Sequence, residues 1–175
     1  GRQGFISQDE AQKLSKWREK VGHDAASILR TAHSMMGIPY MWGGTSPKGV
    51  DCSGFVRTVL YLHDIIIPRN ASQQAKVGKR IQPQDDYADL QPGDLLFFGS
   101  KNQDGSPKRV VHVGISMGGC RFIHSLGYVH TGSFNPLDAD YDEYERNRFL
   151  FAARILPYVN QDTQILTTDN ISLYQ

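Results

Sequence analysis

The sequence predicts an α+β fold, with amino-terminal helices packed on an antiparallel sheet. Apolar residues recur at helical spacing in the first half of the chain. In the second half they alternate as in strands, and the pair Gly118-Gly119 separates two such segments as in a β-hairpin. Helices followed by hairpin-connected strands are typical of α+β domains. A length of 175 residues corresponds to about one domain.

Four segments of the first half have helical patterns. In the polar stretch 1–20, Ser7 stands three residues before Glu10, which favours a short helix with a capping box. In the segment 23–37, Asp24 is placed as the N-cap and Gly37 as the stop. We expect two further helices at about 52–64 and at 70–78, and an ordered aromatic and glycine-rich loop at 38–49.

The second half predicts strands separated by turns. An exposed connection is expected at 83–94, and the expected strands cover 94–99, 109–117, 120–126 and 148–156. The polar segment after Tyr158 is expected to lie along the surface or to fray.

Composition excludes several classes of function. The net charge is +1 and the charges are mixed, so the sequence shows no basic footprint for nucleic acid and no polybasic membrane patch. No apolar run approaches the roughly 18–20 residues of a membrane span. Because the chain opens on Gly-Arg-Gln without methionine, we interpret it as a processed or excised piece.

Cys52 stands where a loop meets a predicted helix, and its neighbours Asp51, Ser53 and Gly54 are poor core residues. The free N–H groups at a helix start favour a thiolate, so this position suits a nucleophile. The alternative is a buried structural cysteine. The adjacent Asp51 carboxylate opposes a low thiol pKa unless backbone donors or substrate occupy it.

A cysteine nucleophile needs a base, and His112 and His124 lie on neighbouring predicted strands. A two-residue Gly118-Gly119 turn would place them on opposite faces. An odd loop or a bulge, with Met117 opposite Arg121 and Gly114 opposite His124, would place them on one face. We predict the second arrangement, because it also keeps Val113, Ile115 and Ile123 on one apolar side.

The other candidates receive plainer interpretations. A zinc site from Cys52, His112 and His124 is conceivable, but no metal-ligand spacing supports it. Cys120 is interpreted as structural or inert, although a bridge between the two cysteines remains open. Packing or surface positions are expected for the remaining histidines, His23, His33, His63 and His130.

Four motifs in order carry a resemblance to a known family: DCSGFV (51–56), LQPGDLLFFG (90–99), HVGI (112–115) and RFIHS (121–125). Over roughly residues 23–157 the chain resembles the NlpC family of cell-wall cysteine peptidases, whose fold is a pared-down papain-like α+β domain. The segments YMWGG (40–44) and PRNASQQ (68–74) resemble the branch that cleaves γ-D-glutamyl–diamino acid bonds of peptidoglycan stem peptides, with short free-amine muropeptides as expected substrates.

The resemblance implies a role for each matching position. Cys52 matches the nucleophile, His112 the general base and His124 the orienting residue. Tyr40 matches a tyrosine beside the oxyanion region. The positions that match substrate-binding residues are Trp42, Asp51, Ser53, Arg69 and Asn70, of which Asp51 suits a free amino terminus and Asn70 replaces an acidic residue. The family's mechanism uses no metal and no cofactor.

The resemblance also divides the chain. Residues 1–22 correspond to a connector from an upstream SH3-like domain, 23–158 to the catalytic domain and 159–175 to a tail. The implied location is the cell envelope or periplasm, with cytoplasmic recycling as an alternative. Two other functions remain open: an acyltransferase or transglutaminase-like enzyme on the same triad, and a non-catalytic wall-binding module.

Overall fold

The computed structural model describes residues 4–172 and places short helices before the sheet. A 3₁₀ turn, η1 (Gln8–Glu10), and the helix α1 (Leu14–Arg18) replace the single helix expected in the first twenty residues. The main helices follow as α2 (Ala25–Ser34), α3 (Cys52–Tyr61) and α4 (Ala71–Gln74). The last two are shorter than predicted; the chain turns after α3 at Asp64, whose φ is 56°.

Six strands within the described part of the chain form an antiparallel sheet in the order β3-β8-β4-β5-β6-β7. Four were predicted: β4 (Leu95–Lys101), β5 (Pro107–Gly118), β6 (Arg121–Leu126) and β8 (Phe149–Arg154). The edge strands β3 (Lys79–Ile81) and β7 (Tyr128–Ser133) were not, and neither was the helix α5 (Glu143–Arg148). A small ribbon, β1 (Thr45–Ser46) with β2 (Gly49–Val50), orders the loop before α3.

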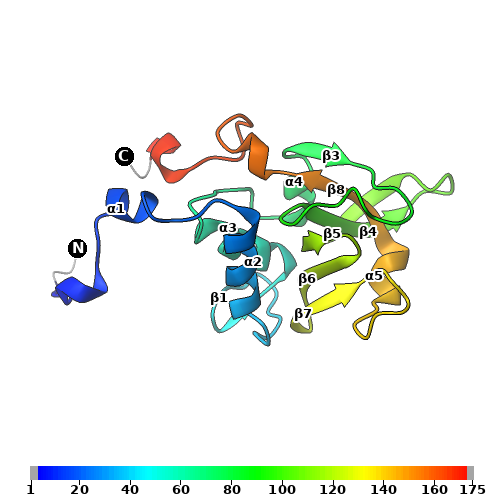
Figure 1. Ribbon diagram of the computed structural model, residues 1–175, viewed down its shortest axis with the longest axis horizontal. Coiled ribbons are helices and arrows are strands. Elements are labelled where there is room, and N and C mark those ends of the chain that lie inside the picture. Colours follow the sequence, from blue (N-terminus) through cyan, green and yellow to red (C-terminus); the bar gives the residue numbers. More distant parts are fainter. Residues whose placement is uncertain (1–3, 173–175) are drawn as a thin grey trace.

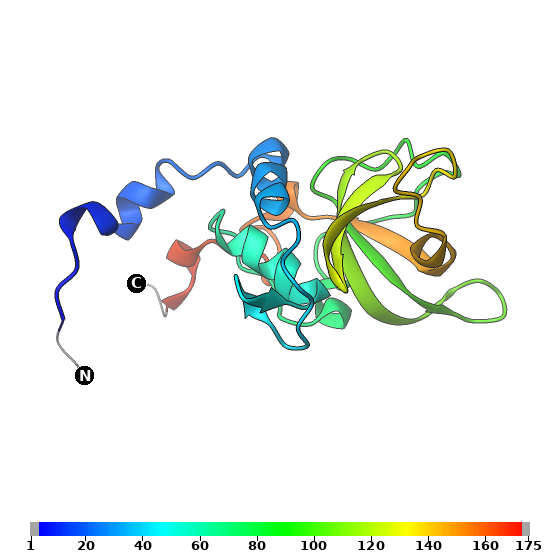
Figure 2. The same cartoon turned by 90° about the horizontal axis from the view of Figure 1, so that it is seen from below.

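Both faces of the sheet are apolar, because successive side chains of a strand point to opposite sides. Val113, Ile115 and Ile123 join the main core with residues of α2 and α3, as predicted. The opposite face holds a second, aromatic cluster that includes Phe98, Phe122, Phe134 and Phe149, beside α5. Figure 1 and Figure 2 show α2 and α3 between the sheet and the terminal segments. The aromatic side chains on the second face are buried as well.

The β5–β6 hairpin contains the bulge that the sequence left as an option. Gly114 pairs with His124, Ile115 with Ile123 and Ser116 with Phe122. The register then shifts, so that Gly118, rather than Met117, lies opposite Arg121. The bulge keeps even-numbered residues of the two strands on one face.

The two terminal segments meet at one end of the molecule, away from the sheet (Figure 2). Arg18 Nε donates to Thr168 Oγ1 at 2.8 Å, and Thr168 Oγ1 donates to Asp64 at 2.6 Å. Within the expected surface tail, Ile165 is fully buried in the main core. None of the helices within residues 4–172 is long and apolar enough to cross a bilayer.

Candidate active site

Cys52 is the first residue of α3, and its side chain is buried among core residues. Asp51 is the N-cap, and its Oδ1 accepts the N–H of Gly54 at 2.6 Å. This bond occupies one donor of the helix start, while the dipole and the neighbouring N–H groups remain directed at the region of the thiol. The predicted position of a nucleophile at a helix N-terminus is thus present in the structure.

The Asp51 carboxylate is held by four neighbours, Gly54, Gly43, Arg69 and Ser53, whose Oγ donates to Oδ1 at 3.3 Å. Oδ2 accepts from Gly43 N–H at 2.9 Å and from Arg69 Nη2 at 2.6 Å, and Oδ1 accepts from Arg69 Nη1 at 2.9 Å. Burial opposes ionisation here, but the hydrogen bonds from Arg69 and Gly54 hold the pKa of Asp51 below its usual range. The expected condition for tolerating a carboxylate beside the thiol, occupation by other donors, is therefore met.

The thiol nevertheless rests in its neutral form. Burial, and then the Asp51 charge, raise the pKa of the Cys52 thiol above its ordinary value. Backbone N–H groups of Ser53 and Val113 act in the opposite direction without overcoming burial. The Val113 contact places the sulfur beside β5, one residue from His112.

His112 and His124 lie on one face of the sheet, as predicted for a hairpin with an odd loop or a bulge. His112 Nε2 and His124 Nδ1 are 2.9 Å apart, and both rings are buried against the aromatic cluster. Burial lowers the pKa of His112 to about 3, and burial followed by the neighbouring imidazoles keeps the pKa of His124 well below its ordinary value. Both rings are consequently neutral at neutral pH.

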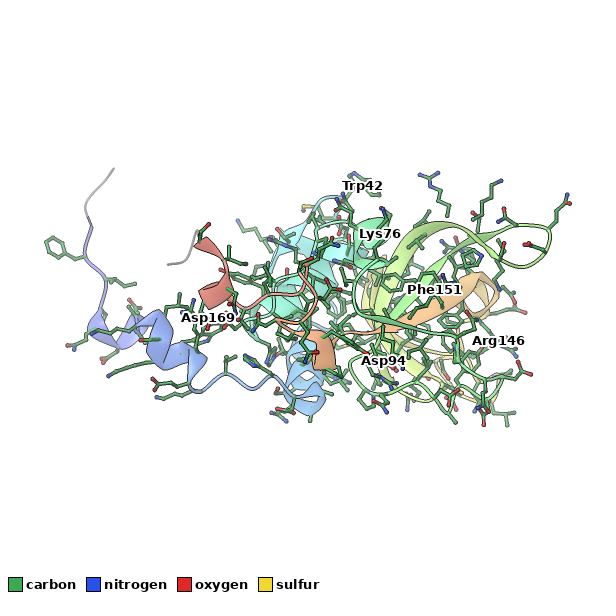
Figure 3. The ribbon with its side chains drawn as sticks, turned by 90° about the horizontal axis from the view of Figure 1, so that it is seen from above. Trp42, Lys76, Asp94, Arg146, Phe151 and Asp169 are labelled. Carbon is green, nitrogen blue, oxygen red and sulfur yellow. The ribbon has the colours of Figure 1, made fainter. Side chains whose placement is uncertain are left out.

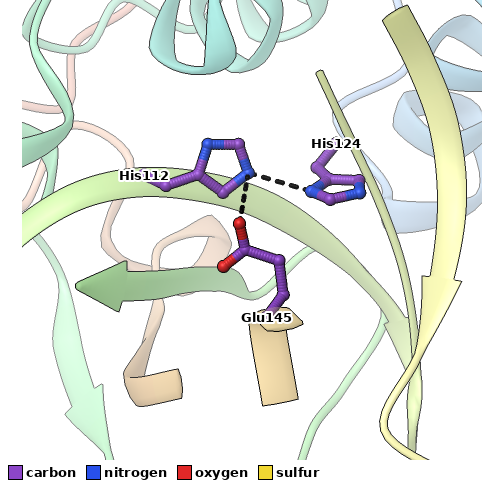
Figure 4. A group of neighbouring side chains, drawn as sticks. All are labelled: His112, His124 and Glu145. Atoms are coloured by element: carbon purple, nitrogen blue, oxygen red, sulfur yellow. Dashed lines mark hydrogen bonds and ion pairs between the residues drawn. The ribbon is translucent and has the colours of Figure 1, made fainter. Parts of the chain in front are cut away.

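Glu145 is a buried carboxyl group beside this pair, and the sequence analysis missed it. Its Oε1 lies 3.9 Å from His112 Nε2 and accepts from Arg148 Nη1 at 2.9 Å (Figure 4). Burial raises the pKa of Glu145 to about 7, against the effect of Arg148. The segment DYDEYERNR (140–148) is highly charged and resembles a solvated surface, so no local signal marked one glutamate as buried.

His130 was interpreted as a packing or surface residue, and the structure places it in contact with the predicted pair. It lies on β7 directly opposite His124, and the two Nε2 atoms are 3.1 Å apart. The alternation of Tyr128, Val129, His130 and Thr131 was the signal for a strand, but the segment was too short to stand out.

A cavity of about 430 Å³ opens beside Cys52. Tyr40, Trp42 and Arg109 contribute to its wall together with Asp51, Ser53, Arg69 and Asn70. Burial, and then the Cys52 and Asp51 charges, raise the pKa of the Tyr40 phenol, so its hydroxyl remains a donor. Trp42 is 88 % exposed and projects from the rim of the molecule (Figure 3).

The remaining predicted residues stabilise the wall of this cavity. Ser53 Oγ accepts from Arg69 Nη1 at 3.0 Å, so Asp51, Ser53 and Arg69 form one hydrogen-bond network beside Cys52. Asn70 precedes α4, and its N–H donates to Gln73 Oε1 at 3.2 Å. Gln74, which was not predicted, ties α4 to α3 by donating to the Ser53 carbonyl at 3.2 Å.

Within residues 4–172, two groups of side chains have ligand atoms close enough to hold a metal ion: His112, His124 and Glu145, and His124, His130 and Asp142. In both groups a ring nitrogen of His124 already lies at hydrogen-bond distance from another imidazole. Cys52 belongs to neither group, and both cysteines are free thiols. His63 is packed as expected, since it bonds to Thr31 Oγ1 at 2.8 Å and to the Gly22 carbonyl.

The arrangement suits acyl transfer through a cysteine. It combines a thiol at a helix N-terminus, a neutral imidazole on the adjacent strand, a second imidazole bonded to the first, and an open cavity beside the sulfur. These are the parts of the cysteine–histidine template: a nucleophile, a base, an orienting group and space for a substrate carbonyl.

Comparison with known proteins agrees with this chemistry. The model of the NlpC/P60 family matches residues 37–149. A γ-D-glutamyl-L-lysine dipeptidyl-peptidase of Bacillus subtilis is 38% identical over 121 residues, which cover 69% of this chain and 37% of that protein. The probable endopeptidase NlpC of Escherichia coli is 43% identical over 101 residues, 57% of this chain and 60% of that protein.

Solved structures show the same fold. An NlpC/P60 family protein from Bacillus cereus superposes with a TM-score of 0.63 at 31% identity, covering 77% of this chain and 41% of that chain. The NlpC/P60 domain of the peptidoglycan hydrolase SagA has a TM-score of 0.59 at 32% identity, covering 75% of this chain and 99% of that domain. The chain spans little more than a third of the length of the Bacillus subtilis relative.

Proposed function

The chain belongs to the NlpC/P60 family of cysteine peptidases, and on this premise we propose that it hydrolyses the γ-D-glutamyl–diamino acid bond of peptidoglycan stem peptides. The observation that carries the proposal is the buried Cys52 at the start of α3, beside a cavity and next to the strand that bears His112. The names of the Bacillus relatives support the bond, and short free-amine muropeptides are the proposed substrates.

In the proposed reaction, His112 acts as a general base because both it and the thiol rest neutral. His112 takes the Cys52 proton while the sulfur attacks the γ-carbonyl carbon of D-glutamate. The Cys52 N–H and the Tyr40 hydroxyl stabilise the oxyanion; in other enzymes, removing one such donor costs about 3–4 kcal/mol. The His112 imidazolium then protonates the leaving amine, and water hydrolyses the thioester.

Charge in the cavity supports recognition of an acidic substrate. A γ-linked D-glutamate keeps a free α-carboxylate next to the scissile bond. The charge of Arg69 is compensated by Asp51, whereas the exposed Arg109 side chain makes no ion pair within residues 4–172. We therefore assign Arg109 to the α-carboxylate and Trp42 to the outer wall, and we retain Ser53 and Asn70 as substrate contacts.

Recognition of a free amino terminus by Asp51 stays a prediction. Its carboxylate has about four acceptor positions, and Arg69, Gly43, Gly54 and Ser53 use them. A substrate ammonium group would have to share or displace the Arg69 bond. Upstream SH3-like domains likewise remain a prediction from the resemblance. We propose the cell envelope as the location, supported by the solved peptidoglycan hydrolases among the relatives.

Mass spectrometry of peptides incubated with the chain tests the proposal. The substrates are L-Ala-γ-D-Glu-diamino acid tripeptides with lysine or diaminopimelate, each with a free and an acetylated amine. We expect release of L-Ala-D-Glu from the free-amine peptide by the wild-type chain and none by Cys52→Ala. Equal cleavage by Cys52→Ala would contradict the nucleophile, and cleavage of both amine forms would contradict free-amine selectivity.

A further inference from the structure

Three imidazoles stand in a row behind the nucleophile. His112 Nε2 and His124 Nδ1 are 2.9 Å apart, and His124 Nε2 and His130 Nε2 are 3.1 Å apart. At the far end, His130 Nδ1 lies 2.9 Å from the carbonyl oxygen of Tyr128. The row therefore begins at a backbone carbonyl on β7 and ends at the histidine of β5.

The carbonyl fixes the direction of every hydrogen bond in the row. A carbonyl oxygen only accepts, so His130 Nδ1 carries a hydrogen, and in a ring with one proton Nε2 is then an acceptor. His124 Nε2 must then donate to His130, which leaves His124 Nδ1 as an acceptor. His112 Nε2 must donate to that nitrogen, and the lone pair of His112 is left on Nδ1.

Two carboxyl groups favour the same direction. Asp142 Oδ2 lies 3.7 Å from His124 Nε2, and Glu145 Oε1 lies 3.9 Å from His112 Nε2. Both distances are too long for hydrogen bonds. An ionised carboxylate nevertheless favours an N–H group facing it over a lone pair, and for Glu145 this holds above its pKa of about 7. If the hydrogen bonds between the three rings ran in the opposite direction, nitrogen lone pairs would face both carboxyl groups.

The free nitrogen of His112 lies on the other side of the ring. Figure 4 shows Nε2 of His112 directed at both His124 and Glu145, while Nδ1 points away from them. The neighbouring residue Val113 directs its backbone N–H at the Cys52 sulfur. The unprotonated nitrogen is thus the one that neither His124 nor Glu145 faces, on a residue that directly precedes Val113.

We propose that His130 is a positioning residue that fixes the tautomer of the catalytic base: by accepting the Nε2–H of His124, it keeps His112 in the Nε2–H form with an unprotonated Nδ1. The role in catalysis rests on the proposed function of Cys52 and His112. In the first step the S–H bond of Cys52 breaks and an N–H bond forms at His112 Nδ1. No proton moves along the row, and His124 stays neutral.

The position of His130 makes it a suitable site for a test. Its ring is half-buried, and it also lines a second cavity, of about 510 Å³, with Tyr128 and Asp142. Water admitted after truncation can either donate to His124 or accept from it, so it would not fix one tautomer. His130→Leu removes the acceptor, whereas His130→Gln offers its amide oxygen in the same region.

Imidazole ¹⁵N NMR measures the tautomers independently of turnover. In the wild-type chain we expect His112 Nε2 to be protonated and Nδ1 unprotonated, and the same in His130→Gln. In His130→Leu we expect mixed tautomers of His112 and a fall in kcat of about tenfold or more with little change in KM, since a wrong histidine tautomer can cost up to about 10⁴-fold in serine proteases. His33→Leu, which removes an exposed histidine on α2, should change neither signal nor rate.

Each outcome decides the proposal. A protonated Nδ1 on His112 in the wild-type chain would show that the row runs in the opposite direction and would overturn it. An unchanged tautomer and rate in a folded His130→Leu variant would show that His130 does not position the base. If the tautomers change as expected but no peptide is cleaved by the wild-type chain, the tautomer assignment stands and the proposed substrate is wrong.

Discussion

Glu145 brings an ionisable group into a site where little water reaches it. Oε2 of this carboxyl group has no hydrogen-bond partner within the described part of the chain, while Oε1 bonds to Arg148. A protonated carboxyl group is the less costly form in such surroundings, which explains the raised pKa. The histidine rings beside it show the matching effect for bases, because burial keeps them uncharged.

Glu145 gives a prediction about stability and pH. The pKa of Glu145 in the folded state is about 7 against an ordinary 4.5. The protonated carboxyl group therefore contributes its full share to folding stability below pH 4.5, and this contribution is lost as pH rises through 7. Urea unfolding should therefore show the stability of Glu145→Gln rising relative to wild type over this range, by at most about 3 kcal/mol at ~1.4 kcal/mol per pH unit. A constant difference across the range would contradict the raised pKa.

His112 and His124 should contribute differently to the proposed reaction. His112 is assigned to proton transfer, whereas His124 only orients it. We expect His112→Ala to abolish peptide cleavage and His124→Ala to leave a measurable rate, lower than wild type by about 10²-fold, which is at the low end of losses from general acid–base catalysis. Steady-state kinetics of both variants checks this order. Equal, complete losses would indicate that the pair acts as one unit.

Among the elements, the start of α3 depends on a close approach of two backbone segments. A Cβ on Gly54 would collide with the carbonyl oxygen of Gly44 and would also crowd the Asp51 carboxylate. The loop that carries Gly43 and Gly44 is thereby held against the helix that carries Cys52, and only glycine permits this contact.

Gly54→Ala should therefore damage both stability and activity. Separating the loop from α3 weakens the cap at Asp51, and overpacking of this kind typically costs about 1–3 kcal/mol. We expect a lower melting temperature together with reduced peptide cleavage. Gly4→Ala is the matched control, because a Cβ there meets no atom within 4 Å. A Gly54→Ala variant as stable and active as this control would contradict the proposed packing.

The hairpin of β5 and β6 was predictable from sequence because β5 alternates from Val111 to Met117, a Gly118-Gly119 pair follows, and both strands carry a histidine at an even position. The prediction that Met117 lies opposite Arg121 was wrong, because the bulge falls at Met117 and shortens the turn. His130 and Glu145 were missed for a different reason. Each becomes buried only when β7 or α5 packs on the sheet, and a single sequence does not show that long-range contact.

At the scale of the whole molecule, the carboxy-terminal segment is part of the fold. Ile165 is fully buried, and Leu166 pairs with Ile66 just after α3. The alternative of a fraying tail followed from its polar composition, which gives little weight to one isoleucine. The contacts of Thr168 with Arg18 and Asp64 then bring both terminal segments together.

Truncating Ile165 should destabilise the entire domain. Ile165→Ala leaves a cavity in the main core, and such substitutions cost about 2–5 kcal/mol. Leu137→Ala, at a residue that is 92% exposed, should change the unfolding free energy by less than about 0.5 kcal/mol. Chemical denaturation of the two variants makes the comparison. Similar stabilities would mean that the segment after Tyr158 contributes little to folding.

The exposure of Trp42 has a practical consequence. The chain contains only two tryptophans, Trp17 and Trp42, and Trp42 stands at the rim of the cavity beside Cys52 with most of its indole in water. A peptide that covers this ring would shift its emission to shorter wavelength. With turnover blocked by Cys52→Ala and Trp17 replaced by phenylalanine, the intrinsic fluorescence of a single residue would report ligand occupancy in real time without any label.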